Sequence, residues 1–356
     1  MRSRERLLAA IKGQPIDHVP WSPFLAYYWE HLPPEVTKMG QFAYLRQMGA
    51  DPLLRGFHHL VKYNWNHCQR TERIVGNEQF VTLDTPVGQL RERYIYSPAG
   101  NTWFLAEHPV KDAEDFKILQ YLHEDLTMEP DFETYLEDRA SCGQDALLLP
   151  TVGVASKTAF QSLVEHWVGT EQLAYILADE PETVEECLAV MQSRDEENVK
   201  LSLQSGADGY IFWEDSSTTN ISPSMFDVYT APEINRWGDL IHREGGLLVH
   251  HACGLLNKLI PSMAKTNIDA IESITPPPTG NLPLQDTAAM LPERIALIGG
   301  LDPVRFLNCT VEEICGDATD LLRDLKHRRF VLANADSCPP DVAYEKFLAI
   351  SELVKK

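Results

Sequence analysis

The segment 247–254 reads LLVHHACG, an apolar run that ends in two histidines and a cysteine. In a strand, side chains two positions apart point to the same face, so His251 and Cys253 share one face and His250 points to the other. An imidazole and a thiolate that converge from one strand end are ligands that zinc prefers. The pattern predicts that His251 and Cys253 bind a metal and that His250 packs or supports them from behind.

Two further residues extend this candidate site. Cys338 follows the apolar run 329–334, and Glu272 lies within the run 268–274. His251, Cys253 and Cys338 would form the three-ligand set with an open position that marks a catalytic zinc, and Glu272 is the best-placed oxygen ligand for that position. A plainer interpretation stays open, in which the cysteines are small buried hydrophobes and Glu272 hydrogen-bonds substrate or backbone.

Carboxylates also end other apolar runs. Glu214 ends the run 209–214 and Asp215 follows it, Asp302 follows the run 295–300, and Asp336 follows the run 329–334. Carboxylates at strand ends can supply acid–base catalysis, and we predict Glu214 and Asp302 as catalytic residues. Acidic residues in such positions also cap the helices that follow, which is the competing interpretation.

Other sequence motifs are weak or missing. The chain has no phosphate-binding loop, no dinucleotide-binding glycine motif and no nucleophile elbow. A second group of metal-ligand types, at His58, His59, His67 and Cys68, lies in a region without clear periodicity, so it predicts a metal site only weakly.

The candidate residues follow a regular alternation of strands and helices. Buried strands are expected near 146–151, 209–214, 247–253, 268–274, 295–300 and 329–334. Amphipathic helices are clearest at 181–204, 232–243, 310–326 and 341–354. With two strands near 18–25 and 51–57, eight units result. This predicts the α/β class and a (β/α)8 TIM barrel, with the site at the carboxyl ends of the strands. An open doubly wound sheet is the alternative.

Two additions to the barrel are expected. Residues 3–12 have helical periodicity and stop at Gly13, which predicts an N-terminal helical extension. Residues 75–108 alternate apolar and polar positions, and TPVG and SPAGN mark turns, so we expect an inserted antiparallel β-meander. No linker-like segment divides the chain, so residues 1–356 are interpreted as a single barrel domain with this insertion.

Composition excludes several partners. The 356 residues carry 31 − 52 = −21 formal charges, which argues against binding to nucleic acid or to anionic lipid. No run of about 18 apolar residues suggests a transmembrane span, and the N-terminus has no apolar signal segment. Seven cysteines without a disulfide rhythm fit a reducing compartment. We therefore expect a cytoplasmic protein.

Several segments carry a resemblance to a known family. RERLLAAIKGQPIDHVPW, GADGYIFWED, SPSMFDVYTAPEI, GGLLVHHACG and ALIGGLDP are similar, in this order, to segments of the uroporphyrinogen decarboxylase superfamily. The resemblance covers essentially the whole chain, and it implies a (β/α)8 barrel. It also implies an enzyme, whose chemistry depends on the branch of the superfamily.

The resemblance favours the cobamide-dependent methyltransferase branch. True decarboxylases resemble one another in an arginine-rich segment after the first strand that grips the porphyrinogen carboxylates, whereas this chain has PWSPFLAYYWEHLPPEV there, without arginine. The methyltransferases carry H-x-C and a distant Cys as zinc ligands, which His251, Cys253 and Cys338 match. An acidic residue can complete that zinc shell, and Glu272 falls about two residues before its expected place.

This branch implies a specific reaction and specific partners. A thiol activated on zinc would take the methyl group from a methylcorrinoid, a cobalamin-type group carried by a partner corrinoid protein, because the chain lacks a D-x-H-x-x-G signature. Trp21, Tyr27, Tyr28 and Trp29 either line the approach to that corrinoid or belong to the core. A tetrahydrofolate-linked corrinoid methyltransferase, a uroporphyrinogen decarboxylase-type carboxy-lyase acting on a tetrapyrrole, an inactive module that binds the corrinoid protein, and a homodimer stay open as alternatives.

Overall fold

The computed structural model describes residues 1–98 and 102–356, which form two compact units. The first unit comprises residues 1–59, 132–151 and 205–356, and the second comprises residues 60–131 and 152–204. Residues 99–101, which belong to the expected SPAGN turn, lie outside the described residues. Among the described residues, no helix combines the length and the apolar character that crossing a bilayer requires.

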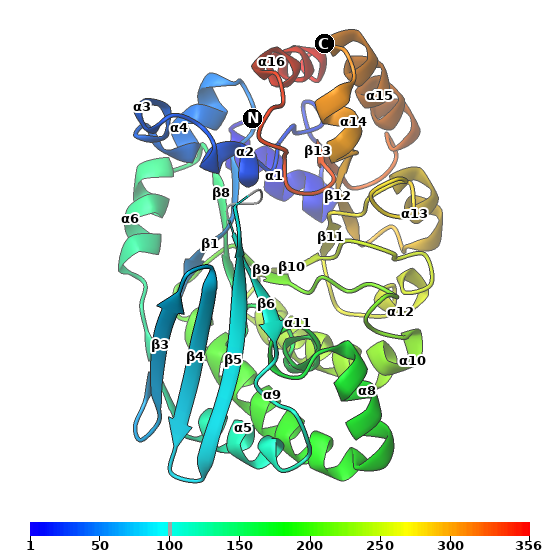
Figure 1. Cartoon of the computed structure of the whole chain (residues 1–356). Helices are drawn as coiled ribbons and strands as arrows, with labels where there is room; N and C mark the ends of the chain where they lie inside the picture. The colour runs from blue at the N-terminus through cyan, green and yellow to red at the C-terminus, as the bar shows by residue number, and fades with distance from the viewer. Residues whose placement is uncertain (99–101) are drawn as a thin grey trace. The chain divides into compact units, whose positions relative to one another are not determined.

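The first unit contains a curled sheet of parallel strands (Figure 1). Its strands, in spatial order, are β1 (Leu53–His59), β8 (Leu147–Thr151), β9 (Gly209–Trp213), β10 (Leu247–His251), β11 (Ala270–Glu272), β12 (Ala296–Leu301) and β13 (Phe330–Asn334). All of these runs are apolar and buried at most positions, as expected for a parallel sheet covered on its outer side.

A short eighth strand closes this sheet into a barrel. Trp21 forms a parallel bridge with Leu332 of β13, and the Ser22 amide donates to the Leu332 carbonyl at 2.9 Å. On the other side, the Asp51 amide donates to the Trp21 carbonyl at 2.7 Å, and the Leu53 amide donates to Ser22 Oγ at 3.1 Å. The segment therefore lies between β13 and β1, and the predicted (β/α)8 barrel is confirmed.

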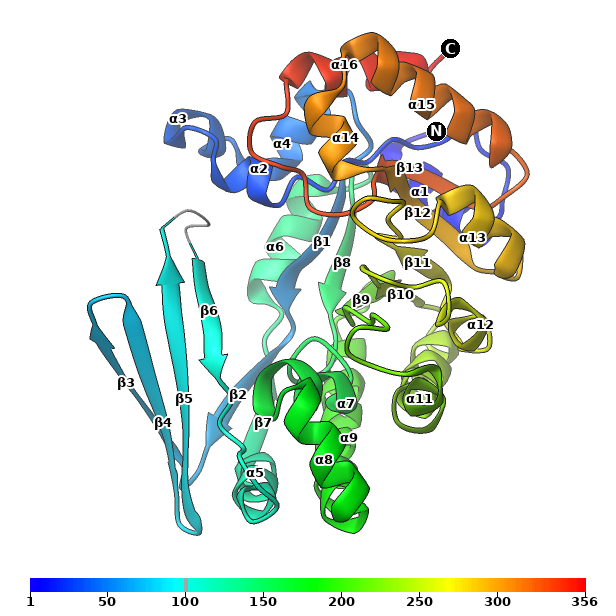
Figure 2. The same cartoon turned by 45° about the vertical axis from the view of Figure 1, so that its right-hand side comes forward.

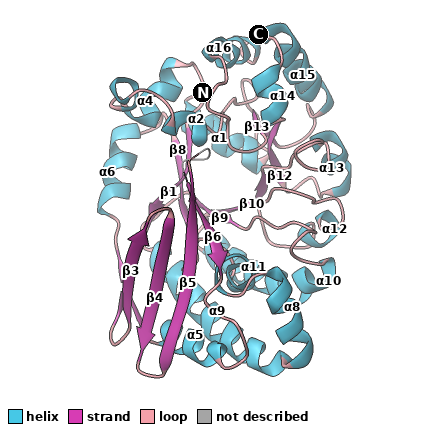
Figure 3. Ribbon diagram, in the orientation of Figure 1, coloured by secondary structure: helices cyan, strands magenta, loops and turns pink. Residues whose placement is uncertain are grey.

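Helices cover the outside of the barrel (Figure 3). The larger ones in this unit are α4 (Gly40–Gln47), α6 (Glu133–Cys142), α11 (Ala231–Arg243), α13 (Leu284–Met290), α14 (Pro303–Asn308), α15 (Val311–Asp324) and α16 (Tyr344–Leu353). Short helices and helical turns are α2 (Tyr27–Glu30), α3 (Pro34–Thr37), α10 (Pro223–Met225), a π-helical turn (Phe226–Thr230) and α12 (Ile260–Met263).

The N-terminal helix α1 (Ser3–Lys12) closes the amino end of the barrel. Leu7, Ala10 and Ile11 belong to one buried cluster with the inward side chains of the strands. The helix ends at Gly13, which adopts the left-handed conformation (φ 68°) that glycine takes without a steric penalty. Helix α1 therefore fills the amino end of the barrel interior with apolar side chains, and the chemically active side chains considered below lie at the carboxyl end.

The second unit is built around antiparallel strands (Figure 2). Its elements are β2 (Val61–Trp65), β3 (Gln69–Val75), β4 (Glu78–Thr85), β5 (Gly88–Ser97), β6 (Thr102–Glu107), α5 (Asp115–Glu124), β7 (Leu126–Pro130), α7 (Ala159–Ser162), a π-helical turn (Leu163–Trp167), α8 (Thr170–Asp179) and α9 (Pro181–Leu203). Strands β3 to β6 form the expected meander, which begins at Gln69, before its predicted start, and turns at TPVG between β4 and β5. β7 pairs with β2 and was not anticipated from the sequence.

Candidate functional site

The barrel register places three chemically distinct side chains beside one another. His251 of β10 is paired with Trp213 of β9 on one side and with Glu272 of β11 on the other. Each is the last residue of its strand, and each follows inward positions such as Ile211, Val249 and Ala270 at a spacing of two. The side chains of Trp213, His251 and Glu272 therefore form one layer at the carboxyl end of the barrel.

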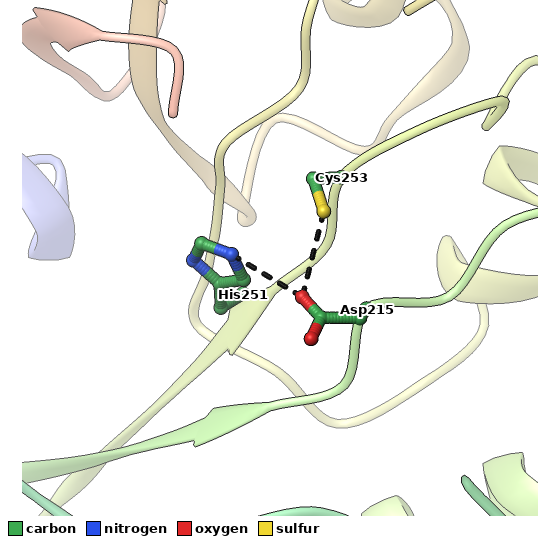
Figure 4. Close-up of side chains that lie close together, drawn as sticks. All are labelled: Asp215, His251 and Cys253. Carbon is green, nitrogen blue, oxygen red and sulfur yellow. Dashed lines mark hydrogen bonds and ion pairs between the residues drawn. The ribbon is translucent and has the colours of Figure 1, made fainter. Parts of the chain in front are cut away.

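Two residues just beyond the strands complete a cluster of possible metal ligands (Figure 4). Asp215 follows β9 and Cys253 follows β10, each two positions after an inward residue. Asp215 Oδ1 lies 3.5 Å from His251 Nε2 and accepts a hydrogen bond from Cys253 Sγ at 3.4 Å. One ligand atom from each of the three residues lies within 4.8 Å of the other two. This is the only such group among the described residues.

A buried ion pair holds His251 in this orientation. Glu272 Oε1 lies 2.9 Å from His251 Nδ1, and Glu272 Oε2 lies 3.1 Å from Nε of Arg55. Arg55 and Glu272 are each 2% exposed. Burial alone would raise the pKa of Glu272, but Arg55 and His251 outweigh it and hold that pKa below its ordinary value. Glu272 is thus a carboxylate that orients the imidazole, leaving Nε2 to face Asp215.

The backbone is unusual at two of the strand ends. Asp215, directly after the buried Glu214, has φ 22°, and Ser273, directly after Glu272, has φ 69°. Non-glycine residues rarely adopt such positive φ values, and these conformations concentrate at functional sites. Asp215 belongs to the cluster and Ser273 follows the partner of His251, which supports a functional role for this end of the barrel.

A cavity of about 500 Å³ opens onto the cluster. Its lining combines aromatic and acidic side chains: Phe24, Tyr27, Trp213, Asp215, His251, Cys253, Thr279, Pro303, Val304, Asp336 and Ser337. The Trp213 ring stacks on Phe24 with 5.8 Å between ring centroids, and it meets His251 edge-on at 4.6 Å.

Gly56 makes room for the Trp213 ring. A Cβ atom at this position would lie 2.0 Å from Trp213 Cζ2, and Gly56 itself has φ 78°. The tryptophan can therefore occupy its place in the wall only because β1 carries glycine there.

Cys338, the second cysteine implied as a ligand, lies apart from this group. It is fully buried, its amide donates to the Phe24 carbonyl at 3.1 Å, and its carbonyl accepts from the Tyr28 amide at 2.9 Å. Burial raises the pKa of its thiol, an effect that Lys346 opposes only in part. The structure therefore groups His251 and Cys253 with Asp215 and leaves Cys338 in the surrounding core; the ligand role that the family resemblance implies for Cys338 can be tested by the zinc content of a Cys338→Ser variant.

The predicted catalytic carboxylates have different surroundings. Glu214 is completely buried, and its amide donates to the His251 carbonyl at 3.1 Å. Asp302 caps α14, because its Oδ1 accepts from the Arg305 amide at 2.8 Å while its Oδ2 accepts from Thr279 Oγ1 at 2.8 Å. These contacts give Asp302 the capping role that the sequence left as an alternative, and neither catalytic assignment is tested by them.

The remaining candidates have ordinary contacts. His250 points away from the barrel interior and stacks on Phe212 at 4.7 Å, and burial lowers its pKa to about 3. His58 Nε2 lies 2.9 Å from Asp138 Oδ2, and His67 Nδ1 lies 2.7 Å from Asp125 Oδ1. Of the four aromatic residues considered for the approach of the corrinoid, Trp21 and Tyr28 are core, Tyr27 lines the cavity, and Trp29 lines a separate pocket.

The sequence placed Asp215 at a strand end but did not indicate it as a metal ligand, and it did not indicate Arg55 at all, although signals for both existed. Asp215 continues the inward spacing of Ile211 and Trp213, which distinguishes it from its neighbour Glu214. Arg55 is a single charge within the apolar start of β1, two positions after the inward Leu53. A buried arginine requires a carboxylate partner, and pattern alone did not reveal which one.

Comparison with known proteins decides the family. The sequence profile of uroporphyrinogen decarboxylase (URO-D) matches residues 106–356, which is more than half of the chain. The chain belongs to the URO-D family. No curated protein matches this URO-D chain.

A solved methyltransferase structure shows the same fold as the URO-D chain. A methyltransferase from Methanosarcina mazei matches with a TM-score of 0.64 and 16% identity, covering 99% of this chain and 98% of that one. A B12-independent methionine synthase from Shewanella sp. W3-18-1 matches with a TM-score of 0.42 and 13% identity, covering 95% and 97%. At 16% identity the likeness to the Methanosarcina mazei protein concerns the fold alone.

Proposed function

We propose that this protein transfers a methyl group from a methylcorrinoid, carried by a partner protein, to a thiol, with zinc held by Asp215, His251 and Cys253. The observation that carries the proposal is the cluster of an imidazole, a thiol and a carboxylate at the barrel mouth, with donor atoms within 4.8 Å of one another. The URO-D family and the barrel shared with a methyltransferase are consistent with this reaction.

The donor set fits zinc on two counts. Nitrogen, sulfur and oxygen ligands from three residues are typical of catalytic zinc sites, which keep one position for water or substrate. Histidine ligands of zinc commonly donate their second N–H to a carboxylate, and Glu272 lies 2.9 Å from His251 Nδ1 in this way. Zinc bound there would lower the pKa of a coordinated thiol, so that the thiol is a thiolate at neutral pH.

The residues of the chain prepare the transfer. Glu272 and Arg55 fix the imidazole, while Trp213 and Phe24 form an apolar wall that limits water around the sulfur. Zinc held by Asp215, His251 and Cys253 would keep the acceptor thiol deprotonated; its sulfur would then form the S–C bond with the methyl group of the methylcorrinoid substrate, while the electron pair of the broken C–Co bond stays with the corrinoid. The methyl group loses no proton, so the transfer requires no general base at Glu214 or Asp302.

A decarboxylase is a poorer match to the charges of the site. A uroporphyrinogen carries eight carboxylates, which require cationic partners. Among the described residues that line the cavity there is no lysine and no arginine, whereas Asp215 and Asp336 are both present. Arg55 is buried against Glu272. The acidic lining therefore disfavours a polycarboxylated tetrapyrrole.

Methyl transfer can be tested without the partner protein. Zinc-loaded protein is mixed anaerobically with methylcob(III)alamin and a panel of small thiols, and the conversion to cob(I)alamin is followed by absorbance. We expect thiol-dependent turnover, reduced at least about 100-fold in Cys253→Ser. Cys315→Ser, which removes a half-exposed thiol on α15, is the matched control and should retain activity.

The opposite results are equally specific. Absence of transfer to every thiol, or full activity in Cys253→Ser, would overturn the proposal. Transfer to tetrahydrofolate instead of thiols would favour the folate-linked alternative, and decarboxylation of uroporphyrinogen that survives Cys253→Ser would favour the lyase.

A further inference from the structure

The cavity at the barrel mouth has an unusual distribution of charge. Its walls contain three aromatic side chains, Phe24, Tyr27 and Trp213, and two carboxylates, Asp215 and Asp336. None of the described lining residues is a lysine or an arginine. A ligand that enters this cavity therefore meets aromatic surface and negative charge together.

The buried cation Arg55 does not offset this charge within the cavity. The guanidinium of Arg55 lies 4.7 Å from the centroid of the Phe24 ring, so Phe24 separates it from the cavity. Arg55 is 2% exposed and its charge faces Glu272, with Arg55 Nε 3.1 Å from Glu272 Oε2. The charges of Arg55 and Glu272 therefore neutralise each other on the far side of the Phe24 ring from the cavity.

When the charges of zinc and its three ligands are balanced against one another, the carboxylate of Asp336 is the charge of the cavity wall that is not compensated. Zinc with two positive charges would be neutralised by the Asp215 carboxylate and the Cys253 thiolate, with His251 neutral. Asp336 Oδ1 accepts a hydrogen bond from the Ser337 amide at 2.6 Å, and no lysine or arginine of the described chain forms a salt bridge with it. One half-buried carboxylate on the cavity wall thus has no lysine or arginine partner among the described residues, and His251, whose charge acts on it in the metal-free chain, would be neutral on zinc.

We propose that the thiol acceptor carries a positive charge, in the form of a short aminothiol or a thiol with a quaternary ammonium group, and that Asp336 selects it. This inference rests on the proposed function. An ammonium group pairs with the Asp336 carboxylate, and the aromatic wall contributes cation–π attraction, as in sites that recognise quaternary ammonium ligands. A sulfonate or carboxylate on the thiol would instead be repelled by Asp336.

Three thiols with the same two-carbon spacing test the inference. Transfer from methylcob(III)alamin to 2-aminoethanethiol, 2-mercaptoethanol and 2-mercaptoethanesulfonate is compared as kcat/KM. We expect the cationic thiol to be preferred over the anionic one by roughly 10-fold or more. Since the three thiols differ in their own pKa, the decisive quantity is the change in this ratio in Asp336→Asn.

The cationic-to-anionic ratio should change in the variant of Asp336 but not in a control variant of Asp341. Asp336→Asn should reduce the cationic-to-anionic ratio by roughly 10-fold, mainly through KM. Asp341→Asn removes an exposed carboxylate outside the cavity and should leave the ratio unchanged. Preference for the sulfonate in the parent protein, or a ratio insensitive to Asp336→Asn, would overturn the inference while leaving methyl transfer intact.

Binding can be measured independently of methyl transfer. Choline and ethanesulfonate, which have no thiol, are titrated against the zinc-loaded protein by calorimetry. Choline binding that weakens in Asp336→Asn supports the cationic site even if no thiol is methylated, in which case only the proposed function fails. Ethanesulfonate binding in place of choline contradicts the cationic site.

Discussion

Glu272 Oε1 lies 2.9 Å from Nδ1 of His251, deep at the carboxyl end of the barrel. The second oxygen of the same carboxylate faces Arg55. Arg55, Glu272 and His251 therefore form a continuous series of buried polar contacts, at the end of which Nε2 of His251 remains available. Because these contacts fix the imidazole ring of His251, the free energy of metal binding depends on Glu272 and Arg55, which are not themselves ligands.

Replacing Glu272 by Gln should weaken zinc binding. The amide keeps the size of the side chain but loses the charge that orients His251, and we expect a roughly 10- to 100-fold loss of affinity, measured by competition with a chromogenic chelator. Asp269→Asn is the matched control, because Asp269 Oδ2 lies 2.8 Å from His242 Nε2 in a similar pair outside the cavity. Unchanged affinity in Glu272→Gln would contradict the orienting role.

The effect of Glu272 on protein stability can be separated from its effect on the orientation of His251 by substitutions in the Arg55–Glu272 pair. Glu272→Gln leaves the Arg55 charge buried without its partner, which should lower the free energy of unfolding by about 3–5 kcal/mol. The double variant Arg55→Met/Glu272→Gln removes both charges and should recover much of that loss in denaturant unfolding. Zinc affinity should stay low in both variants; recovery of affinity with stability would show that Glu272 acts only through folding.

The Trp213 wall depends on the glycine that faces it. In Gly56→Ala, the new methyl group would overlap the Trp213 ring and displace this wall of the cavity. The overlap should lower the free energy of unfolding by roughly 1–3 kcal/mol beyond the usual cost of placing alanine at a positive φ. Gly76→Ala shares the positive φ (62°) but meets no atom within 4 Å. Thermal unfolding and KM for the thiol should therefore change more in Gly56→Ala; equal effects would argue against the contact.

A buried histidine of the second unit should make stability depend on pH. Burial lowers the pKa of His123, in α5 of the second unit, to about 4. Its pKa in the unfolded chain is near 6.5, so between these values the unfolded state binds the proton first and the folded state loses stability as the pH falls. The loss amounts to roughly 3 kcal/mol when complete.

Urea unfolding between pH 7.5 and about pH 4 tests this expectation. His123→Gln should flatten the dependence relative to the parent protein, because the variant has no imidazole to protonate. Curves with the same slope in both proteins would show that His123 does not contribute to the loss of stability.

The sequence allowed the barrel to be predicted because its strands are short, apolar and regularly spaced. Six of them were expected within a few residues of β8 to β13, and the helix that closes the amino end was predicted over the same residues, 3–12. The strand at Trp21 was expected as a longer segment, but prolines at positions 20 and 23 flank it and limit its pairing to one bridge. β7 was missed because its residues LTMEP have a polar, exposed pattern typical of a loop.

The site was predictable only in part. Alternation along β10 correctly separated His250 from His251, since this rule depends on the strand alone. Which carboxylate approaches His251 depends on the loops after β9 and β11, whose conformations at Asp215 and Ser273 have positive φ and no simple sequence signature. The position of Cys338 likewise depends on its hydrogen bonds to the segment around Phe24, which lies more than three hundred residues earlier in the chain.

Zinc content of the purified protein tests the central claim most directly. Elemental analysis should give about one zinc per chain in the parent protein, almost none in Cys253→Ser and Asp215→Asn, and a nearly full complement in Cys338→Ser. Loss of zinc in Cys338→Ser, with retention in Asp215→Asn, would favour the ligand set that the family resemblance implies. Absence of zinc from parent protein prepared without chelator would contradict the metal centre altogether.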